Sequence, residues 1–284
     1  MPLTATQTTA LTTAIRETAA AEILPRFRNL AASDIDTKSS ATDLVTIADR
    51  AAERAMTERF QAILPGDTVI GEEAISEGTA SLDGIASGRC VVIDPIDGTW
   101  NYAHGNANYG VLVAVIEDGE TVWGCCYDPS FDDWVSASKG CGAWFHQGDT
   151  SRRLHTRQDA GPLSEMRGNI GEMYMPQNRR DAVARIIPQL QRHTSLGASV
   201  MEYRQMALGG SDFCLNAHLN VWDHGAGALC LSEAGGVNRL LDGRDYTPDM
   251  TVKGVGEGCY LLNARSDAVW EAVAEKLTAA LDEH

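Results

Sequence analysis

The chain has 284 residues, of which 44% are hydrophobic and 22% charged, so it is long enough and apolar enough to bury a full globular core. Its formal net charge of −16 argues against nucleic acid and anionic membranes as partners, because both would repel it. An acidic protein that takes an anionic substrate needs bound cations to invert the local field, so the charge is compatible with metal-dependent phosphate chemistry.

The seven cysteines form no CxxC pair and show no zinc-ligand spacing, which predicts reduced and mostly buried thiols. The first thirty residues lack both the basic opening and the apolar run of a secretion signal. No later apolar run is long enough to cross a bilayer. We therefore expect a cytoplasmic protein.

An amphipathic helix is expected from about Thr9 to Leu30, because apolar residues recur there near helical spacing. Residues 34–42 are polar and predict a loop or hairpin that contains Lys38. Considered alone, a lysine in such a loop is ordinary solvated surface.

A second helix is expected to follow Asp43–Thr46 and to end at Pro65-Gly66. Asp49 falls near its start, where a carboxylate interacts favourably with the helix dipole, and this is the ordinary role for such a residue alone. Thr68–Ile70 predicts a short strand that delivers Glu72. A carboxylate at the end of one buried strand, followed about twenty residues later by two more at the end of another, is what a shared metal site requires.

The second of these strands leads into the most informative stretch of the chain. Val91–Ile93 is short, β-branched and apolar, and the strand is expected to end at Asp94 because Pro95 has no N–H for a ladder. Asp94 and Asp97 flank the turn, so their carboxylates can converge, while Gly98 lets backbone N–H groups face an anion. Such a corner suits Mg²⁺ and phosphate. An ordinary Asp-Pro turn explains this string equally well when it is considered alone.

Beyond this corner, four strand-like runs separated by turns predict an antiparallel meander. They are Tyr109–Ile116, Thr121–Tyr127, Trp134–Ala137 and Ala143–Phe145. From about Leu154 helices and strands alternate, with helices expected over Asn178–Leu190 and Ser199–Leu208. We expect one rigid unit, 1–284, made of an N-terminal subdomain, 1–153, and a C-terminal subdomain, 154–284.

The last informative stretch begins at Val221. Its apolar and small residues predict a buried helix that stops at Gly235-Gly236. Asp223 lies at its start, where capping is the ordinary role, and the small residues 225–228 allow a close approach to another backbone or a metal. The chain is expected to close with a strand, Gly258 to Leu262, and a helix from Ser266.

Taken together in order and spacing, these motifs resemble those of the inositol monophosphatase family, over nearly the whole chain. The matching residues are Lys38, Asp43-Leu44-Val45-Thr46 with Asp49, Gly71-Glu72-Glu73, Asp94-Pro95-Ile96-Asp97-Gly98-Thr99 with Asn101, and Trp222-Asp223 with Glu233-Ala234-Gly235-Gly236. The resemblance implies an α+β or α/β fold, a layered α-β-α-β-α sandwich like that of fructose-bisphosphatase. It also implies a homodimer that hydrolyses phosphate monoesters with Mg²⁺ and is sensitive to lithium.

The same resemblance implies a role for each site residue. Glu72, Asp94 and the backbone carbonyl of Ile96 would hold a first metal ion. Asp94, Asp97 and Asp223 would hold a second, and a looser third ion would sit near Glu72.

Further roles implied by the resemblance concern water and phosphate. Thr99 and Asp49 would orient the attacking water, the backbone of Gly98 and Thr99 would bind phosphate, and Lys38 would lie at the edge of the metal site. His104 is interpreted as structural or as a support for the site residues.

Departures from the family pattern leave the leaving group open. Inositol-specific members carry a glutamate that contacts the inositol hydroxyls where this chain has Asn216, and Trp100 stands where smaller or polar residues are common. The residues expected to contact the substrate are Asp97, Gly197, Ala198, Ser199, Asn216 and Asp223. Inositol 1-phosphate is the default substrate. The alternatives are histidinol phosphate, a sugar phosphate or bisphosphate, a phosphoadenosine compound, or a regulatory binding protein with vestigial catalysis.

Overall fold

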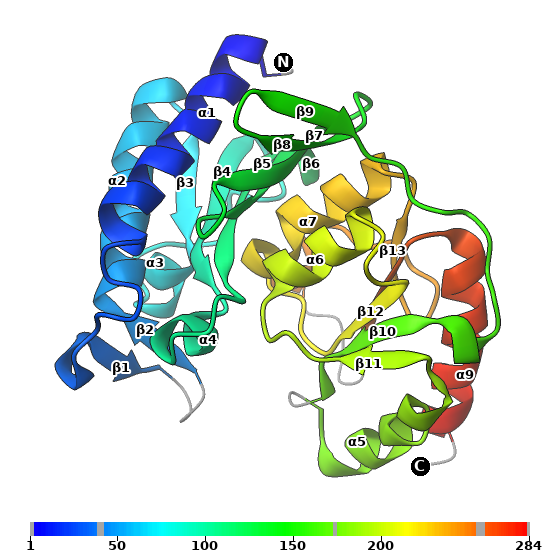
Figure 1. Ribbon diagram of the computed structural model, residues 1–284. Helices are drawn as coiled ribbons and strands as arrows, with labels where there is room; N and C mark the ends of the chain where they lie inside the picture. Colours follow the sequence, from blue (N-terminus) through cyan, green and yellow to red (C-terminus); the bar gives the residue numbers. More distant parts are fainter. Residues whose placement is uncertain (1–2, 39–42, 173–174, 254–258, 283–284) are drawn as a thin grey trace.

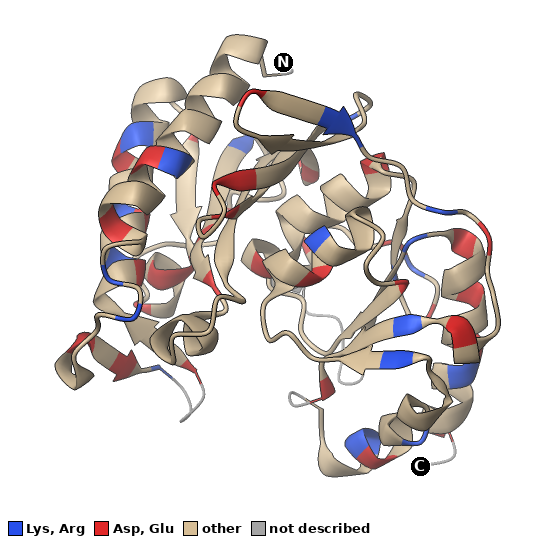
Figure 2. Cartoon of the chain, viewed as in Figure 1, with Lys and Arg blue, Asp and Glu red and all other residues tan. Residues whose placement is uncertain are grey.

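The computed structural model describes residues 3–38, 43–172, 175–253 and 259–282. Two β-sheets alternate with three helical layers, which confirms the expected α-β-α-β-α sandwich (Figure 1). The outer layers are α1 (Ala5–Thr18) with α2 (Ile47–Ile63) and α5 (Gln177–Ala184) with α9 (Asp267–Asp282). The central layer is α6 (Ser199–Ala207) with α7 (Val221–Glu233). Acidic and basic residues are distributed over all of the layers (Figure 2).

The first sheet has seven strands in chain order. They are β3 (Thr68–Gly71), β4 (Arg89–Asp97), β5 (Gly110–Glu117), β6 (Glu120–Asp128), β7 (Asp133–Ser138), β8 (Ala143–Gln147) and β9 (Thr150–Arg153). β3 runs parallel to β4, and every later pair is antiparallel, which confirms the predicted meander.

Both faces of this sheet are apolar because helices cover both. Val91 and Val113 pack against α1 and α2, whereas Val92 and Leu112 pack against the central helices. Alternate residues of one strand therefore belong to two different cores.

The second sheet has five strands in the order β11-β10-β12-β14-β13. They are β10 (Arg167–Ile170), β11 (Arg192–Thr194), β12 (Phe213–Asn216), β13 (Val237–Leu240) and β14 (Leu261–Ala264). Val269, Val273 and Leu277 of α9 are buried in the core cluster that includes residues of β12 and β14. Cys214 of β12 packs against α6 and α7 on the other side.

The remaining elements are short. A hairpin of β1 (Ile35–Thr37) and β2 (Leu44–Thr46) confirms the expectation for this polar segment, although residues 39–42 lie outside the described ones. The short helices are α3 (Glu72–Ser76), α4 (Thr99–Ala103) and α8 (Met250–Lys253). No helix of the described ranges is long and apolar enough to cross a bilayer.

Two predicted boundaries were wrong, both near a proline. β4 does not end at Asp94: pairing with β5 shifts register between Asp94 and Asp97 and then resumes, so Pro95 sits in a bulge rather than ending the strand. The helix expected to reach Leu190 ends at Ala184, and a separate 3₁₀ turn, Ile187–Gln189, contains Pro188.

A third predicted boundary was also wrong. The helix expected from about Thr9 to Leu30 begins at Ala5, ends at Thr18 and continues only as a π-helical turn, Ala19–Ile23. The last strand is Leu261–Ala264 rather than Gly258 to Leu262, and Gly258 lies outside the described residues. The helix that begins at Val221 is confirmed, with Gly235 just past its end at a φ of 103°.

Candidate active site

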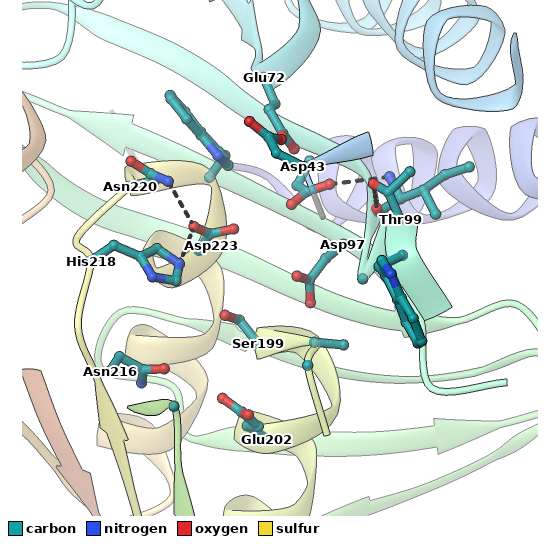
Figure 3. Close-up of a pocket in the computed structure, with 18 of the residues that line it drawn as sticks. Asp43, Glu72, Asp97, Thr99, Ser199, Glu202, Asn216, His218, Asn220 and Asp223 are labelled. Atoms are coloured by element: carbon teal, nitrogen blue, oxygen red, sulfur yellow. Dashed lines mark hydrogen bonds and ion pairs between the residues drawn. The ribbon is translucent and has the colours of Figure 1, made fainter. Parts of the chain in front are cut away.

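Three buried carboxylates converge between the first sheet and the central helices. One carboxylate oxygen from each of Asp94, Asp97 and Asp223 lies within 4.8 Å of the other two. Asp94 and Asp97 come from the end of β4, and Asp223 comes from the first turn of α7, far away in the chain. Figure 3 shows Asp97 and Asp223 facing one cavity together with Glu72.

The bulge in β4 explains how Asp94 and Asp97 reach the same point. In a regular strand, residues three apart point to opposite faces, and the extra residue of a bulge changes this alternation. Asp94 Oδ1 accepts a hydrogen bond from the Ile96 N–H at 3.1 Å. Asp97 Oδ2 accepts one from the backbone N–H of Val200, in the first turn of α6.

Glu72 approaches from the neighbouring strand. β3 and β4 are parallel, with Gly71 opposite Ile93, so the residues that follow them lie side by side. Lys38 Nζ lies 2.8 Å from Oε1 of Glu72 and 2.8 Å from Oε1 of Glu73. The structure therefore places Lys38 beside the carboxylates of Glu72 and Glu73.

Burial and mutual repulsion make this cluster poorly able to hold its negative charge alone. Burial, together with the charge of Glu72, raises the pKa of Asp94 well above its usual value, and burial with the charge of Asp223 does the same for the pKa of Asp97. Burial raises the pKa of Glu72 to about 7, although Lys38 opposes the rise. A bound cation would relieve this repulsion.

Asp223 differs from its neighbours because two side chains hold it. Burial would raise its pKa, but the hydrogen bond and charge of His218, together with smaller effects of His224 and Asn220, outweigh burial and lower the pKa. His218 Nε2 lies 3.0 Å from Asp223 Oδ2, and Asn220 Nδ2 donates to the same oxygen at 3.1 Å. No hydrogen bond from the described part of the chain reaches Oδ1, so this oxygen can serve as a ligand.

His218 and His224 also lie within ligand distance of Asp223, but they do not make a second metal site. His224 Nδ1 lies 3.1 Å from the Tyr203 hydroxyl, and Nε2 lies 3.0 Å from the carbonyl oxygen of His218. Burial lowers the pKa of His224 to about 4, so the ring is neutral. Both ring nitrogens of His224 therefore have hydrogen-bond partners within the protein, and His224 links α7 to Tyr203 and His218 rather than binding a metal.

Asp49 and Thr99 meet beside the carboxylates. Asp49 is buried in the first turn of α2, where its Oδ2 accepts hydrogen bonds from the N–H and the hydroxyl of Thr46 in a capping box. Its other oxygen, Oδ1, lies 3.1 Å from Thr99 Oγ1. Asp49 thus both caps α2 and contacts Thr99.

Gly98 occupies a position that another residue would fit poorly. Its φ is 84°, in the left-handed region, and an added Cβ would lie 2.8 Å from Ala198 Cβ and 2.9 Å from the Asn108 carbonyl oxygen. The backbone at the start of α4 therefore approaches the loop before α6 closely.

The carboxylates open into a cavity of about 390 Å³. All six residues expected to contact the substrate line it: Asp97, Gly197, Ala198, Ser199, Asn216 and Asp223. Asp49 and Lys38 are not among the lining residues. Trp100, with 46% of its surface exposed, also lines the cavity, and its ring is stacked on His104 at 4.0 Å between centroids.

Residues 4–284 match the inositol monophosphatase family. The chain belongs to this family. Its members include the inositol-1-monophosphatase of Bacillus subtilis, which is 30% identical over 216 residues, or 75% of this chain and 78% of that protein. The fructose-1,6-bisphosphatase/inositol-1-monophosphatase of Thermotoga maritima is 28% identical over 75% of this chain and 77% of its own length. This is a family of phosphoric monoester hydrolases.

The solved structure of a Thermotoga maritima inositol monophosphatase superposes with a TM-score of 0.79. The match covers 96% of each chain, with 22% sequence identity. At this identity the likeness supports the fold alone.

The donor set of this inositol monophosphatase family member fits a hard cation. Asp94, Asp97 and Asp223 offer carboxylate oxygens that converge, Glu72 lines the same cavity, and buried carboxylates are otherwise costly. Ile96 also lines this cavity, and its carbonyl oxygen lies 3.0 Å from Thr99 Oγ1. The single hydroxyl hydrogen of Thr99 is shared between this oxygen and Asp49 Oδ1, so the carbonyl keeps at least one lone pair for another partner.

Sequence reasoning missed three residues of this site. His218 and Asn220 orient Asp223, and Glu202 lines the cavity from α6. The only local signal for Glu202 is its position three residues after Ser199, on the same face of the predicted helix. His218 and Asn220 lie in an irregular segment, where no periodicity could have identified them.

Proposed function

We propose that this protein is a Mg²⁺-dependent phosphatase of a small phosphorylated metabolite, with inositol 1-phosphate as its default substrate. The main support is the convergence of Asp94, Asp97 and Asp223 within 4.8 Å, beside Glu72 and a cavity large enough for a small metabolite. We further propose that it acts in the cytoplasm as a homodimer.

The proposal assigns two to three Mg²⁺ ions to each subunit. Glu72, Asp94 and the carbonyl oxygen of Ile96 hold one, Asp94, Asp97 and Asp223 hold another, and a looser third lies near Glu72. When bound, Mg²⁺ lowers the pKa of a water molecule and neutralises the phosphoryl oxygens. Asp94 would belong to both ligand sets.

The other residues position the reacting groups. Thr99 and Asp49, already joined by a hydrogen bond, orient the attacking water. The backbone N–H groups of Gly98 and Thr99 bind the phosphate, which is supported by the position of both residues in the cavity lining. Lys38 holds Glu72 in place at the edge of the site. Gly197, Ala198, Ser199 and Asn216 line the space left for the leaving group.

The leaving group is the open part of this proposal. Alternatives are histidinol phosphate, a sugar phosphate or bisphosphate, and a phosphoadenosine compound. The Thermotoga relative, whose name joins fructose-1,6-bisphosphatase with inositol-1-monophosphatase, supports the breadth of this set. A regulatory binding protein with vestigial catalysis is the alternative from another class.

Phosphate release with and without Mg²⁺ and lithium, across these substrates, tests the proposal. We expect release that requires Mg²⁺ and is inhibited by lithium. Asp94→Asn should abolish turnover, while the melting temperature of the metal-free protein should not fall, because the change removes one of several repelling charges. Near-normal turnover by this variant, or no release from any substrate, would contradict the assignment.

A further inference from the structure

The cavity contains one carboxylate that the metal site does not use. Glu202, in the first turn of α6, lines the same cavity but is 7% exposed. Figure 3 shows it near Ser199 and Asn216, at the opposite side of the cavity from Glu72. Glu202 therefore faces the end of the substrate that carries the leaving group rather than the phosphate.

The carboxylate of Glu202 is only partly satisfied. Cys214 Sγ donates to Oε2 at 3.1 Å, and Asn216 Nδ2 lies 3.5 Å from the same sulfur. Within the described ranges, Oε1 has no hydrogen-bond partner, and no lysine, arginine or histidine forms an ion pair with Glu202. Oε1 is not one of the fully buried polar atoms without a partner, so it is open to the cavity, where a ligand can pair with it.

Charge in the cavity favours a cation at this position. Of the described residues that line it, six are acidic and none is lysine or arginine; the acidic ones are Asp43, Glu72, Asp94, Asp97, Glu202 and Asp223. In the proposed function Mg²⁺ balances the metal-ligand group and the phosphate, but Glu202 lies outside that group. The charge of His218 partly offsets the effect of burial on the pKa of Glu202, but His218 is paired with Asp223.

Two neighbours suit a nitrogen-bearing leaving group. The side-chain amide of Asn216 lies beside the Glu202 carboxylate. A ligand nitrogen with more than one hydrogen can therefore donate to both side chains. The exposed ring of Trp100, stacked on His104, offers an aromatic face at the same cavity. Cations and flat rings both bind favourably to such a face.

We propose that Glu202 determines specificity by binding a protonated nitrogen on the leaving group, so that the preferred substrate is the phosphate monoester of an amino- or imidazole-bearing alcohol. This inference rests on the proposed function, and among the substrates given there it favours histidinol phosphate over the default, inositol 1-phosphate. A second phosphate placed at this end of the cavity would be repelled by Glu202, so bisphosphates should be poor substrates.

An isosteric pair of substrates tests the inference directly. With 4-aminobutyl phosphate and pentyl phosphate, which differ mainly in one charge, the wild-type protein with Mg²⁺ should show at least a tenfold higher kcat/KM for the amine. Glu202→Gln should remove this preference by raising KM for the amine alone. Glu202→Asp, which keeps the charge, should retain part of the preference. Glu58→Gln, at an exposed position of α2, removes the same charge elsewhere and should change nothing.

A binding measurement separates this inference from the proposed function. Calorimetry with 4-amino-1-butanol, Mg²⁺ and inorganic phosphate should show binding to the wild type and to Glu58→Gln but not to Glu202→Gln. Equal kcat/KM for both substrates in the wild type, or an unchanged preference in Glu202→Gln, would overturn the role of Glu202. Absence of turnover with every phosphate ester would overturn the phosphatase assignment, whereas Glu202-dependent binding of the amine would still support the cation site. Melting curves check that each variant is folded.

Discussion

Asp49 Oδ1 lies 3.1 Å from the hydroxyl oxygen of Thr99, and this contact joins the first turn of α2 to the first residue of α4. The other Asp49 oxygen is held by Thr46, so the carboxylate cannot rotate freely. The Thr99 hydroxyl also lies 3.0 Å from the carbonyl oxygen of Ile96. The hydroxyl is therefore fixed beside the proposed metal ligands.

Removing this hydroxyl should impair turnover more than stability. Thr99→Val keeps the shape of the side chain but loses its hydrogen bonds, and we expect kcat to fall about 10²-fold or more, as for loss of proton-transfer assistance. The melting temperature should fall only slightly, since one such hydrogen bond contributes about 1 kcal/mol. Thr99→Ser is the matched control and should keep most of the activity. A Thr99→Val variant with normal kcat would rule out a role in orienting water.

Gly98→Ala should impair both folding and activity. The added Cβ would strain a left-handed residue and collide with Ala198 and the Asn108 carbonyl. Gly66→Ala is the control, because its φ of 98° imposes similar backbone strain with nothing within 4 Å. We expect the control to lose about 1–2 kcal/mol of unfolding free energy and Gly98→Ala to lose more, together with turnover. Denaturant titration and phosphate release measure both effects, and equal losses would contradict the close approach.

Lys38→Gln should destabilise the protein most when Mg²⁺ is absent. The lysine contacts Glu72 and Glu73, and its side chain is only 10% exposed, so its loss leaves two carboxylates without their cation. Removing one partner of a buried pair costs about 3 kcal/mol. Thermal melts should show a larger stabilisation by Mg²⁺ in the variant than in the wild type, because the ion replaces the lost charge.

The control for this experiment is Lys276→Gln, at an exposed ion pair with Glu275. Exposed pairs contribute little, so its melting temperature should match that of the wild type with and without Mg²⁺. Equal melting temperatures for Lys38→Gln and Lys276→Gln would show that Lys38 does not stabilise the carboxylate group.

Glu202 should make the metal-free protein less stable as pH rises. Burial raises its pKa to about 7 from an ordinary value of 4.5. Between these values the folded state binds more protons than the unfolded state, so stability falls as pH rises from about 4.5 and levels off above about 7. The charge then costs on the order of a few kcal/mol.

The Glu202→Gln variant should lose the part of the pH dependence of stability that Glu202 causes. Its melting temperature should be close to that of the wild type at pH 5 and higher at pH 8, and Glu58→Gln should show no such divergence. A difference between variant and wild type that stays constant from pH 5 to pH 8 would contradict the burial of an ionised Glu202. A buried charge that makes the protein less stable is expected where a residue is retained for function rather than for folding.

Local sequence pattern predicted most of the elements. The run from Tyr109 to Ile116 and the helix from Val221 were identified correctly, because apolar periodicity and glycine stops are properties of a few neighbouring residues. The end of β4 was not, because a proline can be accommodated in a bulge when the partner strand resumes pairing beyond it. Whether β5 resumes pairing with β4 beyond the bulge depends on the whole sheet and cannot be deduced from Pro95.

The sequence by itself determined which carboxylates stand at strand ends. Glu72 follows β3, and Asp94 and Asp97 lie in the last four residues of the adjacent strand β4. Parallel pairing of these strands brings Glu72 beside β4, whereas the bulge in β4 brings Asp94 and Asp97 together. The resemblance had already assigned Asp223 to the group, and the tertiary structure shows one of its oxygens within 4.8 Å of Asp94 and Asp97; that Glu202 faces the leaving-group side of the cavity came from the tertiary structure alone. The positions of Asp223 and Glu202 both depend on how α7 and α6 pack against the sheet. Contacts between residues so far apart in the chain produce no periodic pattern in the sequence.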